Sequence, residues 1–191
     1  QQDADQEVVR IQGELGKLRA EADFPVEFLS IASVRRPEDL RAAADLAASD
    51  VILVYAAGGW MDIFTALGET GKDLIFFCRH KSGPVYLWYE IISPRYLRQH
   101  TDVLTIKGAT DEDVVIDSLE EILWRLRALA GLRNTLGTRI LAIGGPDAWA
   151  QPQGVVPRLV EEKWKFDMRT IPYDELGRLI KEAHSDQSAV E

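Results

Sequence analysis

The chain has few of the residues on which several common kinds of site depend. Its 191 residues include one cysteine, three histidines and two methionines. A single cysteine, Cys78, cannot form a disulfide within the chain, which agrees with a reducing compartment such as the cytoplasm. Cys78 lies in the apolar run LIFFC. Cys78 could be a catalytic thiol or a small hydrophobic side chain packed in the core, and the sequence favours packing.

The histidines are scattered along the chain and have no spacing that is typical of a metal site. They are His80, His100 and His184, and the motifs H-x-x-H, H-E-x-x-H and C-x-x-C do not occur. Metal sites made from side chains usually show such short spacings, because one helix or turn then supplies two ligands. We therefore expect no metal site made within this chain.

The chain also lacks a long apolar run and an excess of positive charge. No stretch approaches the roughly 20 apolar residues of a membrane-spanning helix. Lysine and arginine total 22 against 31 aspartates and glutamates, and the formal net charge is −9. Affinity for nucleic acid and for anionic membranes depends on lysine and arginine. The composition therefore argues against both kinds of partner.

What the sequence does contain is an alternation of helical patterns with short apolar runs. Helices are expected at about residues 5–22, 36–50, 62–69 (or a loop), 93–100, 111–131, 155–165 and 174–185, and strands at 25–34, 51–57, 73–79, 83–91, 102–108, 138–145 and 166–172. The HKSG linker between the third and fourth strands is too short for a helical crossover, so it predicts a hairpin or an irregular excursion. The alternation as a whole indicates an α/β protein with a doubly wound, flavodoxin-like or Rossmann-like, mostly parallel sheet.

The predicted elements divide into two units. Residues 1–132 form a first α/β domain that the long helix closes, and residues 133–191 start a second α/β unit. Two strands cannot hide both faces of a sheet, so the last two either join the first sheet or belong to a second domain that is truncated here. Because the chain opens at Gln1 with a helical pattern, we expect a fragment that lacks a preceding strand rather than a processed protein.

The strand predicted at 51–57 ends in an unusual group of residues. Ligands of open α/β sheets bind at the carboxyl ends of the strands, and this strand is followed by Gly58, Gly59 and Trp60. The glycine pair permits a close approach of a ligand to the backbone, although an ordinary turn uses the same residues. Trp60 either packs on a loop or forms one wall of a ligand site, because the apolar face of a sugar ring stacks well on indole.

Cationic residues follow the next predicted strand. Arg79, His80 and Lys81 are either solvated charges on a turn or contacts to an anion or a sugar hydroxyl. The IGGPDAW segment after the strand at 138–145 has the same ambiguity as the first glycine pair. The motifs G-x-G-x-x-G and G-K-[ST] do not occur, so nucleotide binding has no motif support. Glu90 ends an aromatic-rich strand and could face a cleft, but we do not assign it as a base.

The order of these features resembles the amino-terminal region of the L-fucose and L-arabinose isomerase-like proteins. The resemblance rests on a doubly wound unit, a glycine turn with tryptophan, a long helix, and the segments LRNTLGTRILAIGGP and FDMRTIPYDELGRLIKEA. In that family a second domain often opens with a comparable strand, followed by a helix, a hydrophobic strand and a helix that contains E-L. Thr138 to Ala183 has this order.

The resemblance implies a non-catalytic amino-terminal portion of an aldose–ketose isomerase-like protein. Family members use a divalent metal, commonly manganese, whose ligands lie downstream of the region present here. Their amino-terminal domain contributes substrate contacts and an oligomer interface, so the implied partners are a small sugar and further copies of the chain. Trp60 matches a family tryptophan that contacts substrate. We add Gly58, Gly59, Arg79 and His80 as candidate substrate-binding residues and assign no catalytic residue.

Two alternatives belong to other functional classes. One is a stand-alone binding module, flavodoxin-like or periplasmic-binding-like, for a small polar ligand. The other is a structural α/β domain that scaffolds a partner. A ligand bound by an intact monomer would favour the first, and the lack of any ligand effect on melting temperature would favour the second.

We predict that this chain binds no catalytic metal on its own. Isothermal titration calorimetry with manganese should show no stoichiometric site tighter than about micromolar, a dissociation constant that corresponds to roughly −8 kcal/mol. A tighter stoichiometric site would contradict the expectation that all metal ligands lie outside this sequence.

Overall fold

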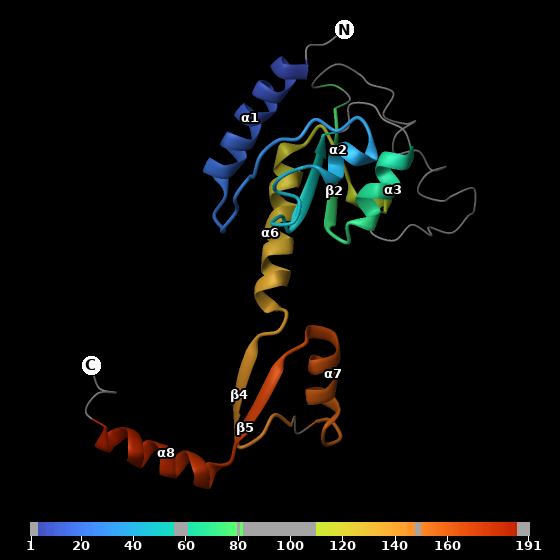
Figure 1. Ribbon diagram of the computed structural model, residues 1–191. Coiled ribbons are helices and arrows are strands. Elements are labelled where there is room, and N and C mark those ends of the chain that lie inside the picture. Colours follow the sequence, from blue (N-terminus) through green and yellow to red (C-terminus); the bar gives the residue numbers. More distant parts are fainter. Residues whose placement is uncertain (1–3, 56–60, 80, 82–109, 148–149, 187–191) are drawn as a thin grey trace. The chain divides into compact units, whose positions relative to one another are not determined.

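The computed structural model of the chain describes residues 4–55, 61–79, 81, 110–147 and 150–186. The chain divides into two compact units, Gln1–Arg127 and Ala128–Glu191, and the boundary falls within a single helix, α6 (Leu119–Thr135). Each unit combines helices with parallel strands (Figure 1). The chain is therefore an α/β protein, as the alternating sequence pattern predicts.

The first unit is built on a three-stranded parallel sheet. Its described elements are α1 (Ala4–Glu21), α2 (Pro37–Arg41), β1 (Val51–Tyr55), α3 (Met61–Glu69), β2 (Asp73–Cys78), the 3₁₀ turn η1 (Asp111–Asp113), β3 (Val114–Ile116) and the first half of α6. The strand order is β1-β2-β3, with Leu53 opposite Ile75 and Phe77 opposite Val115. The central position of β2 gives it a neighbour on each side.

The core of this unit forms around β2. Five consecutive residues, Leu74 to Cys78, are buried, which is the pattern of a strand covered on both faces. Leu74, Phe76 and Cys78 pack against α3, where Phe64 lies with its ring centroid 5.8 Å from that of Phe76. Alternate residues of a strand point to opposite faces, so Ile75 and Phe77 face the other side.

The predicted helix at residues 5–22 is confirmed as α1. Its buried side chains, Ile11 and Leu18, are two turns apart and therefore lie on one side of the helix. Asp5 and Glu7 stand in its first turn and Arg19 in its last, an arrangement that the helix dipole favours. The predicted strands at 51–57 and 73–79 are likewise confirmed as β1 and β2, and the segment 62–69, left open between a helix and a loop, is helical as part of α3.

Two sequence predictions in the amino-terminal part are wrong. The segment 25–34 forms no strand in the described sheets, and within it the Ser30 N–H donates to Asp45 Oδ2 (3.0 Å) and not to a neighbouring strand. The helix predicted over 36–50 ends at Arg41. Beyond it the backbone forms tight turns such as that closed by the Leu46 N–H and the Ala43 carbonyl (3.2 Å).

The long helix predicted from Asp111 also starts later than expected. The acidic residues that resemble a helix start form the turn η1, and the β-branched VVI that follows pairs with the edge of β2 as β3. Asp117 adopts a positive φ of 55° after β3, and α6 begins at Leu119. The Ser118 hydroxyl accepts the Glu121 N–H (3.1 Å), so the S-x-x-E motif marks the true start of the helix.

The second unit contains a separate two-stranded parallel sheet. Its described elements after α6 are β4 (Arg139–Ile143), α7 (Val155–Trp164), β5 (Asp167–Ile171) and α8 (Tyr173–Ser185). These confirm the predicted order of strand, helix, strand and helix. The expectation left open whether these strands join the first sheet, and in the structure β4 pairs with β5 alone among the described strands.

The second unit has no buried side chain among its described residues. Large hydrophobic residues are exposed on α6, β4, α7 and α8 and just after α6, namely Leu132, Leu136, Leu141, Ile143, Leu159, Trp164, Tyr173 and Ile180. From the apolar runs we expected six core residues, namely Leu53, Val54, Ile75, Phe76, Ile140 and Ile143. Ile75 and Phe76 are confirmed, whereas Leu53, Val54 and Ile140 are half-buried. Ile143 is 47% exposed and was wrongly assigned. The reason is that nothing described here covers the β4 face to which Ile143 belongs.

Three predicted elements lie outside the described residues. They are the strands at 83–91 and 102–108 and the helix at 93–100. The question of a hairpin after β2 falls there too.

We predict that Phe76→Ala destabilises the protein strongly and that Leu141→Ala does not. Phe76 is 1% exposed, whereas Leu141 is 56% exposed. Truncating a buried phenylalanine costs about 3–5 kcal/mol, and exposed substitutions usually stay within about 0.5 kcal/mol. Denaturant unfolding followed by circular dichroism measures both. Similar losses for the two variants would contradict the assignment of β2 as the centre of the core.

Candidate functional site

The candidate site lies at the carboxyl ends of the parallel strands of the first unit. Tyr55 is the last residue of β1, Arg79 directly follows β2, and Asp117 directly follows β3. In an open α/β sheet this edge is where ligands bind, because the strand ends and the loops after them form a crevice there. The structure therefore brings one predicted residue, Arg79, together with residues that the sequence analysis did not select.

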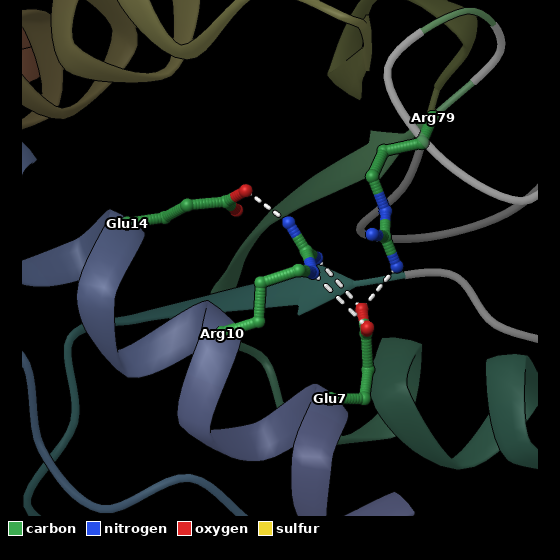
Figure 2. Close-up of polar contacts among 4 residues, drawn as sticks. All are labelled: Glu7, Arg10, Glu14 and Arg79. Carbon is green, nitrogen blue, oxygen red and sulfur yellow. Dashed lines mark hydrogen bonds and ion pairs between the residues drawn. The ribbon is translucent and has the colours of Figure 1, made fainter. Parts of the chain in front are cut away.

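Arg79 belongs to a cluster of four charged side chains, which we call the α1–β2 charge cluster: Glu7, Arg10, Glu14 and Arg79 (Figure 2). Arg10 donates two hydrogen bonds to the Glu7 carboxylate, from Nε to Oε2 (3.0 Å) and from Nη2 to Oε1 (2.7 Å). Arg79 donates from Nη2 to the same Glu7 Oε1. Arg10 also donates from Nη1 to Glu14 Oε1, so the Glu7 carboxylate lies between two guanidinium groups.

Helical spacing explains why three members of the cluster come from α1. Residues three or four positions apart lie on the same side of a helix, so Glu7, Arg10 and Glu14 form one polar row. The buried residue Ile11 follows directly after Arg10. The row therefore borders the face that α1 turns toward the protein, and from there it reaches the end of β2.

The cluster is partly buried and electrically balanced. The Arg79 side chain is 6% exposed, that of Glu7 16% and that of Glu14 23%. Two carboxylates and two guanidinium groups give a formal charge of zero, which a buried set of charges needs because each unpaired ion would lose its hydration without compensation. The hydrogen bonds from Arg10, and the positive charges of Arg79 and Arg10, lower the pKa of the Glu7 carboxyl. The pKa of Arg10 is raised in return, chiefly by its hydrogen bond with Glu7.

Tyr55 lies beside this cluster and adds a neutral hydroxyl. Burial, followed by the negative charge of Glu14, raises the pKa of Tyr55 well above its ordinary value. The Tyr55 hydroxyl and Glu14 Oε2 are both buried, and neither has a partner in hydrogen-bond geometry among the described residues. Buried polar atoms are normally satisfied. The two groups lie close enough for a hydrogen-bonding interaction with Glu14 to contribute to the raised Tyr55 pKa, so this corner of the cluster holds a donor–acceptor hydroxyl beside a carboxylate acceptor.

The turn after β2 is fixed from the end of β3. The Asp117 N–H donates to the Cys78 carbonyl (3.0 Å), and the Lys81 N–H donates to Asp117 Oδ2 (2.7 Å). Aspartate tolerates the positive φ found at Asp117 better than most residues. Asp117 thus links two strand ends and helps to set the direction in which Arg79 leaves the sheet.

Cys78 is a packed core residue, as the sequence favours. It is 1% exposed and lies in the cluster of side chains that packs between β2 and α3. Burial raises its pKa to about 11. The thiol is therefore protonated at neutral pH, which disfavours a nucleophilic role because the thiolate is the reactive form.

Most of the predicted substrate-binding residues lie outside the described part of the chain. These are Gly58, Gly59, Trp60 and His80. Arg79 is described, and its guanidinium is engaged by Glu7. Contact between any of the five and a substrate stays a prediction.

The glycine turn after β4 has a local packing role. Gly144 has a φ of +80°, and a Cβ at this position would lie 2.5 Å from the ring of Tyr173 at the start of α8. The Gly144 N–H donates to the Ile171 carbonyl (2.9 Å). Gly144 is therefore needed to let the ends of β4 and β5 meet the first turn of α8.

The described residues do not fit the divalent metal that the resemblance implies for the full-length family. Among them no group of three or more histidine, cysteine, aspartate or glutamate side chains could hold a metal ion. The two cluster carboxylates, Glu7 and Glu14, are both held by Arg10.

Within the same described residues, no helix is long and apolar enough to cross a membrane.

Comparisons with known proteins add no relative. A scan against models of protein families gives no match, and neither does a search of curated proteins. The resemblance to sugar isomerase-like proteins therefore rests on the sequence features described above.

We predict that Glu7 makes folding stability depend on pH in the acid range. Its pKa is lower in the folded protein, so the stabilisation is complete above the unfolded value of about 4.3 and is lost as the pH falls through the folded value. Glu7→Gln should therefore be less stable at pH 7 and lose less stability between pH 6 and pH 3. Urea unfolding at a series of pH values measures this, with Glu21→Gln, an exposed carboxylate of α1, as the matched control. If the stability of Glu7→Gln fell with pH as steeply as that of the parent, the ion pairs of Glu7 with Arg10 and Arg79 would contribute nothing to stability.

Proposed function

We propose that this chain is the non-catalytic amino-terminal portion of a sugar isomerase-like protein and that it contributes to a sugar-binding pocket. The observation that carries this proposal is the collection of polar side chains at the carboxyl ends of β1 and β2. Tyr55, Arg79 and the α1 members of the charge cluster meet at the edge of the sheet where α/β proteins bind small ligands. The order of sequence features shared with the isomerase-like proteins supplies the ligand class.

The chemistry of this edge suits a polyhydroxylated ligand. A guanidinium group donates several hydrogen bonds in a fixed planar arrangement, and a carboxylate accepts them, so together they can bind hydroxyl groups from both sides. In the proposal Trp60 stacks on the apolar face of the sugar ring. Gly58 and Gly59 let the backbone approach it, and Arg79 and His80 contact its hydroxyls.

The proposal includes a wider architecture than the described sheets. We place the first unit in a doubly wound sheet and the second unit at the start of another α/β domain. In this proposal the complete protein is a cytoplasmic homo-oligomer whose divalent metal, manganese or another ion, is held by residues outside this chain. Because the described residues do not fit that metal, we assign them only to substrate binding and to assembly.

A second candidate is a stand-alone module that binds a small polar ligand. The buried Tyr55 hydroxyl and the Glu14 carboxylate favour it, because both belong to one compact unit and could contact a ligand without help from another domain. The two candidates differ in a simple measurement. A module binds its sugar as an isolated monomer, whereas the isomerase-like portion needs the complete oligomer for a full pocket.

We predict that Trp60→Ala weakens sugar turnover in the full-length protein and costs this chain little stability. Removing a ring that lines an open site removes little buried contact. The free energy of unfolding should therefore fall by well under half of the about 3–5 kcal/mol that truncation of a buried aromatic residue costs. Loss of stacking should raise KM by roughly 2- to 12-fold, which corresponds to about 0.5–1.5 kcal/mol.

Trp124→Ala is the matched control, since Trp124 is exposed on α6 (61%) and is not among the residues of the candidate site. It should leave turnover unchanged. A loss of several kcal/mol in the Trp60 variant would assign Trp60 to packing. Parental stability together with parental kinetics would remove it from the site.

A further inference from the structure

Arg10 holds two carboxylates with one guanidinium group. Its Nε donates to Glu7 Oε2 (3.0 Å) and its Nη2 to Glu7 Oε1 (2.7 Å), while its Nη1 donates to Glu14 Oε1 (Figure 2). A guanidinium group is planar and presents its N–H donors in a fixed arrangement. These contacts therefore fix the positions of the two carboxylates relative to each other, which the long side chains of Glu7 and Glu14 would otherwise leave variable.

Each of these carboxylates acts in turn on a residue at the end of a strand. Glu7 Oε1 accepts a hydrogen bond from Nη2 of Arg79, which directly follows β2. Tyr55 is the last residue of β1, and its pKa is raised by burial and then by the charge of Glu14 and a hydrogen-bonding interaction with it. Because β1 and β2 are paired neighbours, Arg10 connects two adjacent strand ends through one carboxylate each.

Tyr55 and Arg79 lie close together at this edge of the sheet. Tyr55 is opposite Phe77 in the register of the two strands, with the ring centroids 5.1 Å apart, and Arg79 follows two residues later. Burial raises the pKa of Tyr55, and the positive charge of Arg79 partly counteracts this, so the two groups are within electrostatic reach. A phenol hydroxyl donates and accepts, whereas a guanidinium group donates. The pair therefore suits neighbouring hydroxyl groups of a sugar.

We propose that Arg10 is a positioning residue of the sugar pocket and sets the spacing between two sugar contacts, Arg79 and Tyr55. It acts on Arg79 through Glu7 and on Tyr55 through Glu14. The proposal rests on the proposed function, in which Arg79 contacts the sugar. It deepens that function by adding Tyr55 as a second contact and by giving Arg10 a role in substrate binding that needs no contact with the ligand.

Arg10→Lys tests the proposal in the full-length protein, with L-fucose and L-arabinose as the probes. Lysine keeps the positive charge, but its compact ammonium group cannot reproduce the planar arrangement of donors. KM should rise at least about tenfold while kcat stays within about twofold, the pattern expected when binding is lost equally in the ground and transition states. The control Arg19→Lys changes an exposed arginine of the same helix and should leave both constants unchanged.

Urea unfolding of the same variants separates positioning from packing. Lower stability of Arg10→Lys together with an unchanged KM would show that Arg10 is purely structural and would overturn the proposal. A fall in kcat with an unchanged KM would overturn it as well, because it would place Arg10 in the chemical step.

A measurement on this chain needs no sugar. Rotation of the Arg79 guanidinium group is followed by nitrogen-15 NMR, and its signal is identified by its loss in Arg79→Lys. Arg10→Lys should speed this rotation by at least about threefold, because the Glu7 carboxylate is no longer fixed, and Arg19→Lys should not. Equal rotation rates in Arg10→Lys and the parent would overturn the proposal. If Arg10→Lys fails to fold, Glu14→Gln carries both measurements, with KM and the rotation rate each expected to rise at least about twofold and unchanged values contradicting the proposal.

Failure of this inference can be told apart from failure of the proposed function. Turnover of either sugar by the parent, with KM unchanged in Arg10→Lys, would retain the sugar pocket and reject the positioning role. Neither binding nor turnover of the two sugars, with faster Arg79 rotation in Arg10→Lys, would reject the isomerase-like role and retain Arg10 as the residue that positions Arg79.

Discussion

Burial of β2 on both faces is the constraint from which the rest of the first unit follows. Five consecutive apolar residues of this strand are enclosed by neighbouring strands and by helices. Arg79, the first residue after the strand, is still buried, so its guanidinium group needs a carboxylate nearby to neutralise its charge. Glu7 of α1 supplies it. The position of α1, the composition of the charge cluster and the location of the candidate site are all consequences of how this strand ends.

A buried ion pair of this kind determines position more than it adds to stability. The attraction between Glu7 and Arg79 has to offset the loss of hydration of both groups, so replacing the pair by apolar residues is often neutral or stabilising. Removing one partner is costly because the other is left charged and buried. The cluster therefore favours one placement of α1 over others. It also places charged groups at the edge of the sheet where a ligand would bind. Apolar side chains at the same edge would offer a ligand no ion pairs or hydrogen bonds.

The sequence predicts well those elements whose signal is local. The apolar runs of β1, β2, β4 and β5 and the periodic patterns of α1, α3, α7 and α8 all give the correct type of element. The sequence pattern predicts the wrong element where contacts with distant residues determine the structure. VVI pairs with β2 although the acidic residues before it resemble the start of a helix, and the segment 25–34 pairs with no strand among the described residues. The contact from Glu7 to Arg79 spans 72 positions, so no local pattern predicts it. The E-x-x-R-x-x-x-E row beside Ile11 was the available signal, since charges next to a buried helical face need partners.

The two units show that an apolar run predicts a strand but not its burial. LIFFC in β2 and ILAI in β4 look alike, yet Leu74 is 3% exposed and Leu141 is 56% exposed. The difference lies in what covers them, because β2 has a strand on each side and α3 packed on one face, whereas β4 pairs with β5 alone among the described strands. A two-stranded sheet is marginally stable on its own, and large exposed apolar patches are typical of interaction sites. This contrast, between a first unit with its own buried core and a second unit with exposed apolar side chains, is the reason why we assign ligand contact to the first unit in the proposal.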